Sequence, residues 1–592
     1  MKNLILYFSL LLPICLFGQN DQLAHNYYEK GEFEKALISY QELHKSQPGN
    51  NLYFQRIVES HQQLEQLDIA ENLIRERLDK FRQASLIVEL GYNYHLQKQE
   101  SQAKIQYDQA LDRIRMNPSE VYAVAATFER RSLIDYALKA YTIARELEPR
   151  FSFNQQMAHL YGQIGNTDMM VSMYLDEAVQ NPTAAVMIQN QLSRFMSDEA
   201  DTGFHESLRK ALLLRAQKDQ DIFWNQFLSW YYVQQREYGK AFVQEKAIYK
   251  RNPETFYNIV NLGQLAIEED EDETAVEILT FVLQNTQDIE VLVQSNFYLM
   301  EMQIDKATEK DYVQIQNRLE SLLSEFGISP YTLPLQMLKA QFVTFNLAQP
   351  ELGTAVLRKA MELPLNKHQM ARVKLKLADI LLFEKKFNQA LIYYSQIEED
   401  LKNDALGHEA SLKAAKTSYF KADFTYAHSQ FKVLKSASSQ LIANDALEYF
   451  LLINDNTVAD STQTALKKFA HADYLLYQNR NVDALAQFRS VLQEFKDNEI
   501  EAVTLLRIGN ILKKQHDYQQ ALLQFDQIIQ NHSDGIYVDE ALYFSAEIYN
   551  DHLNDPEKAK ELYERILFGH EDSIYFIDSR KKFRQLRGDA NL

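Results

Sequence analysis

The 592-residue sequence has one cysteine, Cys15, and few glycines and prolines, 16 and 11 in all. A single cysteine cannot form an internal disulfide or a metal site made of several thiolates. Glycine and proline mark turns and interrupt helices, and stretches that alternate apolar and polar residues, as half-buried strands do, are nearly absent. These absences predict a chain that is all helical and is not held together by disulfides.

The sequence also lacks motifs for catalysis or cofactor binding. A Gly-x-x-x-x-Gly-Lys phosphate loop and a His-Glu-x-x-His zinc motif do not occur, and the 14 histidines are scattered. The segment Asn454-Asp455-Asn456 lacks the glycine and the terminal glutamate of a calcium loop. The net charge of −20 argues against non-specific binding to nucleic acid, which needs a basic surface. We therefore expect no enzymatic activity, no cofactor, no metal and no nucleic-acid partner.

The N-terminal segment has the pattern of a secretory signal peptide over residues 1–18. A short basic start precedes an apolar run over residues 4–17, and Gly18 is a small residue directly before polar positions. An uncut membrane anchor is the alternative, but the run is shorter than the roughly 20 residues that span a bilayer. Ile14 precedes Cys15 where a lipoprotein signal needs a small residue. We expect cleavage after Gly18 and an exported, soluble product, since no later stretch is apolar and long enough to span a membrane.

One helical hairpin occurs twice between residues 90 and 149. Three pairs of matching side chains are each separated by 34 positions: Ala103 and Ala137, Tyr107 and Tyr141, and Ala110 and Ala144. Residues at i, i+4 and i+7 share one face of a helix, so the first members of these pairs lie on a single face. The alanines allow two helices to approach closely, and the tyrosines fill the volume between them. Such a hairpin cannot bury its apolar face alone, so copies must stack on one another.

This period, with small residues alternating with aromatic ones, resembles the tetratricopeptide repeat, and the similarity covers most of the chain after the signal. The resemblance implies an all-α, right-handed superhelical solenoid. Residues 19–289 would form a first array and residues 371–570 a second. Between them, residues 290–370 keep the helical period but have few of the small and aromatic residues that mark the repeat. They also contain four prolines, which predicts degenerate hairpins and a bend. Residues 571–592 would form a capping helix and tail.

The last two copies are longer, because His532 to Tyr537 recurs loosely as His570 to Tyr575, 38 residues later. This pattern resembles tetratricopeptide proteins of the Gram-negative envelope, which help assemble outer-membrane proteins or coordinate wall and envelope machinery. The ending Phe-Gly-Gln-Asn of the signal is similar to signals of the Bacteroidetes group. These resemblances imply a periplasmic or outer-membrane-associated protein whose partners are envelope proteins.

The resemblance also implies that the first helix of each hairpin lines a concave groove for a partner. The groove positions expected to contact that partner carry Tyr122, Arg130, Gln155, His159, Gln226, Trp230 and Gln264. Farther along, corresponding positions carry Asp379, Asp473, Asn510 and Lys513. Chaperone-binding relatives hold a partner's terminal carboxylate through a lysine at one groove site. Lysine is absent from that site here, so we do not expect that specialised function.

Trp230 is the most informative of these positions. Trp224, Phe227 and Tyr231 share one face of its helix and are expected in the core, whereas Trp230 falls away from that face. A tryptophan exposed in a groove is a typical energetic anchor for a partner. The alternative is that Trp230 packs on the preceding hairpin and has a structural role.

Two charged segments each allow two interpretations. The acidic run over residues 268–273 is either a solvated turn or a contact for a basic segment or calcium ion. A final helix over residues 573–587 is expected to turn Ile574, Ile577, Phe583 and Leu586 inward. Its outward face would carry Arg580, Lys581, Lys582, Arg584 and Arg587. This helix is either a cap that shields the last hairpin or a contact for an anionic membrane.

These patterns favour a protein–protein interaction scaffold of the bacterial cell envelope that binds a partner's peptide or helix in its groove. Envelope or outer-membrane complex assembly is the process that such a scaffold would serve. The alternative is a peptidoglycan- or carbohydrate-binding module of the cell-wall machinery, because aromatic residues and glutamines in a groove also suit sugars.

Overall fold

The computed structural model describes residues 20–196, 202–219, 221–253, 255–437, 440–458, 462–496 and 498–588. Every regular element in these ranges is a helix, and none of them contains a β-strand. The prediction of an all-α chain is therefore confirmed. The signal peptide predicted over residues 1–18 lies outside the described residues.

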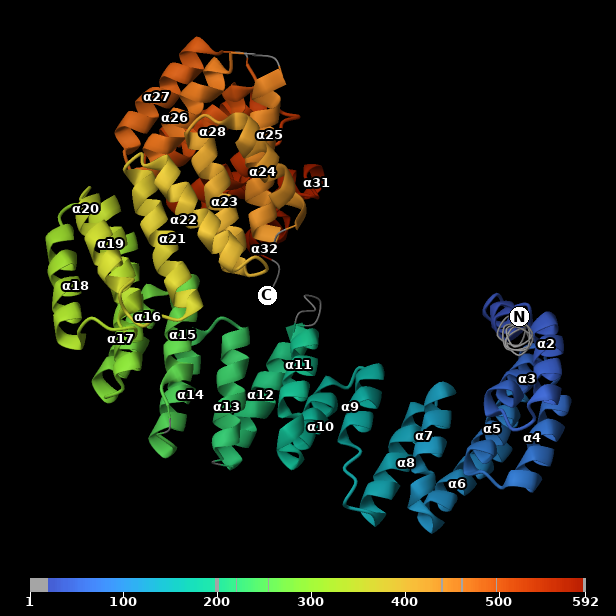
Figure 1. Ribbon diagram of the computed structural model, residues 1–592. Helices are drawn as coiled ribbons and strands as arrows, with labels where there is room; N and C mark the ends of the chain where they lie inside the picture. Colours follow the sequence, from blue (N-terminus) through green and yellow to red (C-terminus); the bar gives the residue numbers. More distant parts are fainter. Residues whose placement is uncertain are drawn as a thin grey trace, which may run out of the picture. The chain divides into compact units, whose positions relative to one another are not determined.

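Two compact units make up the chain, Met1–Trp224 and Asn225–Leu592, and each is a row of packed helices (Figure 1). The helices of the first unit are α2 (Phe33–Ser46), α3 (Asn51–Gln63), α4 (Leu67–Phe81), α5 (Ala84–Leu96), α6 (Glu100–Met116), α7 (Val121–Arg130), α8 (Ile134–Leu147), α9 (Asn154–Gln163), α10 (Thr167–Gln180), α11 (Ala185–Met196) and α12 (Thr202–Lys218). The division falls within α13 (Ile222–Gln234). The array limits expected at residues 289 and 371, and the bend between them, stay predictions.

The second unit contains the remaining helices. They are α14 (Tyr238–Arg251), α15 (Tyr257–Glu268), α16 (Asp272–Asn285), α17 (Ile289–Asp305), α18 (Tyr312–Phe326), α19 (Leu333–Phe345), α20 (Pro350–Ala360), α21 (Lys367–Phe383), α22 (Phe387–Asp400), α23 (Ala405–Phe420), α24 (Phe424–Ala437), α25 (Gln440–Val458), α26 (Thr464–Tyr477), α27 (Asn481–Glu494), α28 (Ile500–Lys514), α29 (Tyr518–Asn531), α30 (Val538–Glu547), α31 (Pro556–Gly569) and α32 (Phe576–Arg587).

Small residues determine how closely the two helices of a hairpin approach. A glycine on the first helix faces the side chain sixteen residues later in three hairpins: Gly91 and Tyr107, Gly263 and Leu279, and Gly509 and Phe525. A Cβ atom at Gly91 would lie 2.6 Å from the ring of Tyr107, so no larger residue fits without movement. Ala103 and Ala137, the alanines of the predicted repeat, are fully or almost fully buried, as close helix packing requires.

Hairpins stack through their first helices. Within the first unit α5 contacts α7, and within the second α15 contacts α17, α17 contacts α19, α19 contacts α21 and α21 contacts α23. Contacts therefore run between neighbours along a row, as in a solenoid. The predicted solenoid of helical hairpins is confirmed, and residues 290–370 are helical hairpins within it.

Helix α25 is an extra element between two hairpins. The marker alanines Ala390 and Ala427 are 37 positions apart, but Ala427 and Ala484 are 57 apart, which leaves room for one additional helix. This helix packs against α24, and α26 then returns to contact α23. The polar residues 454–458 form the end of α25, and Asn456 is buried.

The last helix is rotated from its expected orientation. Phe583 is buried and Leu586 is partly buried, as predicted, but Ile574 and Ile577 are exposed. Lys582 instead turns inward, where its Nζ lies 3.2 Å from the carboxylate of Glu547. Leu586 lies nine residues after Ile577, about half a turn around the helix, so the two cannot share a buried face, and Ile574 precedes the first residue of α32. Within the described ranges, no helix is both long and apolar enough to cross a membrane.

Candidate functional site

Four of the expected groove residues lie on α7 and α9 of the first unit. Arg130 donates to Glu89 at 3.0 Å and lines a cavity of about 250 Å³ between α3, α5 and α7. Tyr122 is half exposed and meets the edge of Phe153. The other two, Gln155 and His159, are partly buried and exposed, respectively. Arg130 lines this cavity, and Tyr122, Gln155 and His159 do not.

The other three expected groove residues, Gln226, Trp230 and Gln264, lie in the second unit. Trp224, Phe227 and Tyr231 are buried, so the predicted core face of α13 is confirmed. Trp230 is neither core nor fully exposed, since it is partly buried and meets Phe227 edge-on. Gln226 is exposed. Gln264 accepts a hydrogen bond of 2.6 Å from the Tyr298 hydroxyl, which joins α15 to α17.

A sizeable cavity of the second unit lies where the small and aromatic residues that mark the repeat are few. It measures about 660 Å³ and is lined by the first helices α17, α19 and α21. Its apolar wall includes Phe297, Tyr331, Met337 and the two prolines Pro330 and Pro334. Tyr331 is 63% exposed, so its ring is available to a ligand. Marker residues did not locate this cavity. The proline cluster was its one signal in the sequence.

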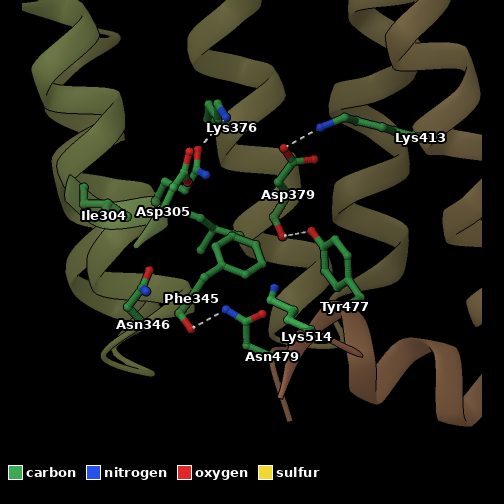
Figure 2. Close-up of a pocket in the computed structure, with 12 residues that line it drawn as sticks. Ile304, Asp305, Phe345, Asn346, Lys376, Asp379, Lys413, Tyr477, Asn479 and Lys514 are labelled. Carbon is green, nitrogen blue, oxygen red and sulfur yellow. Dashed lines mark hydrogen bonds and ion pairs between the residues drawn. The ribbon is translucent and has the colours of Figure 1, made fainter. Parts of the chain in front are cut away.

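A second cavity of about 390 Å³ continues from the first through two shared lining residues, Gln341 and Lys376. Figure 2 shows Asp379 at its centre, with the side chains of Lys376, Lys413 and Lys514 around it. The helices that supply these residues are α21, α23 and α28, and Tyr477 comes from the end of α26. Together the two cavities form an inner groove, which we define as the surface they line.

Asp379 anchors the polar part of the inner groove. Its carboxylate accepts from the Tyr394 hydroxyl at 2.6 Å and pairs with Lys413 Nζ at 2.7 Å. Its backbone carbonyl accepts from the Tyr477 hydroxyl at 2.8 Å. Asp379 is 8% exposed, so it is held by these groups and positions Lys413 for the cavity.

The lysines of the inner groove differ in how their charge is compensated. Burial opposes the charge of Lys413, but the paired carboxylates of Asp379 and Glu409 outweigh it and raise its pKa. Burial lowers the pKa of Lys376 despite the nearby Asp379. Lys376 donates to the neutral Gln341 at 2.6 Å, and no carboxylate in the described part of the chain forms an ion pair with it. Lys376 is therefore a cation that would gain from an anionic or strongly accepting ligand.

Side chains at the end of α26 and in the turn after it cap earlier helices. The Tyr474 hydroxyl lies 2.7 Å from the carbonyl oxygen of Leu382 and donates at the C-terminus of α21. Gln478 donates to the carbonyl of Phe383 at 2.6 Å, and Asn479 donates to that of Phe345 at the end of α19. The last carbonyls of a helix have no partner within it, so these bonds satisfy groups that the helix leaves open.

Replacing Tyr474 with phenylalanine tests this capping contact. We expect the free energy of unfolding to fall by about 1 kcal/mol, because the variant loses the hydroxyl that donates to the Leu382 and Phe383 carbonyls and accepts from Gln478. Gln478 can still donate to the Phe383 carbonyl. Urea unfolding followed by circular dichroism measures the change. Tyr426→Phe, at a half-exposed position, is the matched control and should leave stability unchanged.

A buried ion-pair network fixes the extra helix α25 in place. Arg507 on α28 lies 2.7 Å from Glu448 on α25 and 3.3 Å from Asp473 on α26. The Tyr419 hydroxyl on α23 also donates to Asp473, at 3.1 Å. Burial raises the pKa of Asp473, although Arg507 opposes that rise. Asp473 was expected to face a partner, but it is only 6% exposed and belongs to this network.

The acidic run over residues 268–273 is partly paired within the second unit. Glu269 pairs with Arg236, and Asp272 pairs with Lys306. Across the described residues, no group of three or more His, Cys, Asp or Glu side chains is arranged to hold a metal ion. Pairing with neighbouring hairpins accounts for these two carboxylates.

No family model matches the sequence, and neither does any curated protein. Two solved structures are similar over most of the chain. The first, a structure of Naa15/Naa10 bound to HypK-THB, shares 12% identity over 97% of this chain and 97% of that chain, with a TM-score of 0.26. The second, yeast Tom70, shares 14% identity over 85% of this chain and 99% of that chain, with a TM-score of 0.30. With TM-scores this low, neither likeness supports an argument. The helices themselves form a solenoid of helical hairpins.

Proposed function

We propose that this protein is an exported scaffold that holds a segment of a partner protein in the inner groove of its second unit. The observation that carries the proposal is the continuity of the two cavities, about 660 and 390 Å³, through Gln341 and Lys376. Pre-formed concave surfaces with apolar walls and a few polar groups are where ligands bind. The first helices of a hairpin solenoid supply such a surface without a catalytic centre.

The two parts of the groove suit different parts of one segment. Phe297, Tyr331 and Met337 offer an apolar wall for aliphatic or aromatic side chains. Lys376 and Lys514 offer donors to carbonyl or acidic groups farther along. An extended segment or a helix laid across α17, α19 and α21 would meet both parts. Its binding would be non-covalent, and the chain would act by bringing partners together.

A role in the cell envelope is part of this proposal and rests on the sequence. The pattern of residues 1–18 supports export to the periplasm, and the last two repeats support an envelope partner. The alternative ligand is peptidoglycan or another carbohydrate, because Tyr298 and Tyr331 could stack on sugar rings in the same cavity.

Crosslinking from Tyr331 tests the groove. A photoreactive amino acid at position 331 should capture a reproducible envelope protein in cells, identified by mass spectrometry. Tyr331→Ala should weaken that complex by roughly 2 kcal/mol, about thirtyfold, if this ring is an anchor. The half-exposed Tyr426 outside the groove gives the matched controls, a crosslinker and an alanine at position 426.

Two results would count against a protein partner. Equal capture from positions 331 and 426 would show that the groove is not the binding surface. Retention of the purified chain on isolated peptidoglycan, lost in Tyr331→Ala, would assign the groove to the cell wall instead. Thermal melting of each variant verifies that it is folded.

A further inference from the structure

The C-terminal end of the second unit exposes an unusual set of side chains. Six large apolar side chains in the described ranges are at least 67% exposed, and three of them lie between residues 568 and 577. These three are Phe568, Ile574 and Ile577, with exposed fractions of 78%, 67% and 74%. The terminal repeat of a solenoid normally presents a polar outer face. The C-terminal end therefore exposes apolar side chains where a simple capping helix would expose polar ones.

Positive charge accompanies these apolar residues. Ile577, Arg580, Lys581 and Arg584 follow the spacing i, i+3, i+4 and i+7, so they share one face of α32. Helix α32 carries five cations and one carboxylate, in a chain whose net charge is −20. Phe568, Ile574, Ile577, Arg580, Lys581 and Arg584 are named the terminal surface here.

The opposite face of α32 holds the helix firmly on the last hairpin. Phe583 and Ser579 are buried there. Lys582 pairs with Glu547 at 3.2 Å and with Asp578 at 3.3 Å, and Asp578 also accepts from the Tyr543 hydroxyl at 2.6 Å. Asp578, the one carboxylate of α32, thus contacts Lys582 and the last hairpin. Ile577 and Lys581 lie on the face of α32 turned away from these contacts, and both are exposed.

We propose that the terminal surface docks on an anionic lipid membrane. Apolar side chains that protrude beside lysine and arginine can insert at the boundary between headgroups and acyl chains while the cations meet lipid phosphates. Charge complementarity favours this occupant. A protein segment binds best in a concave surface such as the inner groove. The terminal surface is instead made of side chains that protrude from one helix and the turn before it. This docking would place the inner groove of a soluble scaffold at the membrane.

A fluorophore at position 577 reports the contact directly. Cys15→Ser leaves the chain without cysteine, so Ile577→Cys provides one labelling site for an environment-sensitive dye in the full chain. The control label replaces Val482, which is 77% exposed and lies on α27. The probe is a vesicle of phosphatidylcholine with phosphatidylglycerol, compared with phosphatidylcholine alone. A local dye separates this contact from any contribution of the N-terminal apolar run.

We expect a blue shift at position 577 with the anionic vesicles, and none at position 482 or with neutral vesicles. Neutralising Arg580 and Lys581 with glutamine should weaken binding about fivefold per charge, roughly twenty-five-fold together. Lys310→Gln with Lys402→Gln removes the same charge at exposed positions away from α32 and should leave binding nearly unchanged.

Three results would overturn the proposal. One is the absence of a blue shift at position 577 with anionic vesicles. Another is an equal loss of binding in the two double-glutamine variants. The third is a blue shift that develops with protein concentration in the absence of vesicles, which would make the terminal surface an interface between copies of this chain. Melting temperatures equal to that of the parent verify that the variants remain folded.

Discussion

Arg507→Leu is expected to lower the free energy of unfolding by about 3 to 5 kcal/mol, the range found when one member of a buried ion pair is removed. The variant leaves Glu448 and Asp473 without their shared cation, and Asp473 is 6% exposed. Because these three residues come from α28, α25 and α26, the loss should loosen the joint around the extra helix. Urea unfolding followed by circular dichroism measures the change.

The loss in free energy of unfolding caused by Arg507→Leu should grow as the pH rises. Burial raises the pKa of Asp473 in the folded chain, and removing Arg507 removes the charge that opposes this rise. A carboxyl whose pKa is raised by folding stabilises the protein fully below its unfolded pKa, and this contribution is lost as the pH rises through its folded pKa. The deficit of Arg507→Leu should therefore be larger near about pH 8 than near about pH 5.

An exposed ion pair supplies the matched control. Arg480 pairs with Asp483 three residues later, and the two side chains are 52% and 53% exposed. Arg480→Leu should change stability by less than about 1 kcal/mol, because water screens such pairs. If Arg507→Leu cost no more than Arg480→Leu, the network around Asp473 would not hold α25 in place.

Gly353→Ala should destabilise the second unit by about 1 to 2 kcal/mol. Gly353 lies on α20, and a Cβ atom there would sit 2.7 Å from the backbone oxygen of Ala340 on α19 and 2.9 Å from Ile380. A backbone atom cannot rotate away as a side chain can, so the two helices must separate. Forcing extra atoms into a packed core costs about 1 to 3 kcal/mol, which exceeds the gain of about 0.5 to 1 kcal/mol from the better helix former.

Gly569→Ala, in the last turn of α31, is the control for this substitution. Nothing lies within 4 Å of a Cβ atom at Gly569, so alanine should be neutral or slightly stabilising there. Midpoints of urea unfolding compare the two variants with the parent. An unfolding midpoint for Gly353→Ala equal to that of Gly569→Ala would mean that α19 and α20 do not pack as closely as described.

The sequence predicted the core of the hairpins better than it predicted the site. Small and aromatic residues at fixed spacing report helix–helix distance, so Ala103, Ala137 and the core face of α13 were correctly assigned. The expected groove residues were carried over from the repeat pattern, and their role as partner contacts stays a prediction. Asp473 shows why such positions can mislead, because its carboxylate is buried and paired with Arg507 instead of being exposed to a partner.

The small and aromatic residues that mark the repeat did not predict the inner groove. Tyr331 and Met337 come from a region where the repeat pattern is weak, and Lys376 comes from a helix that is otherwise largely apolar. These side chains meet because α17, α19 and α21 stack, which is a contact between hairpins. The spacing of residues within one hairpin does not predict which side chains of different hairpins meet.

The sequence by itself determined that this chain is all helical and built of hairpins, because a local period of side-chain sizes specifies which helix faces meet. The close contact of Gly509 with Phe525 likewise lies within one hairpin, since the two are sixteen residues apart. Only the tertiary structure decided where α25 is accommodated, that Lys376 forms no ion pair within the described residues, and which face α32 exposes. Each of these depends on contacts between residues distant in sequence, as between Lys582 and Glu547.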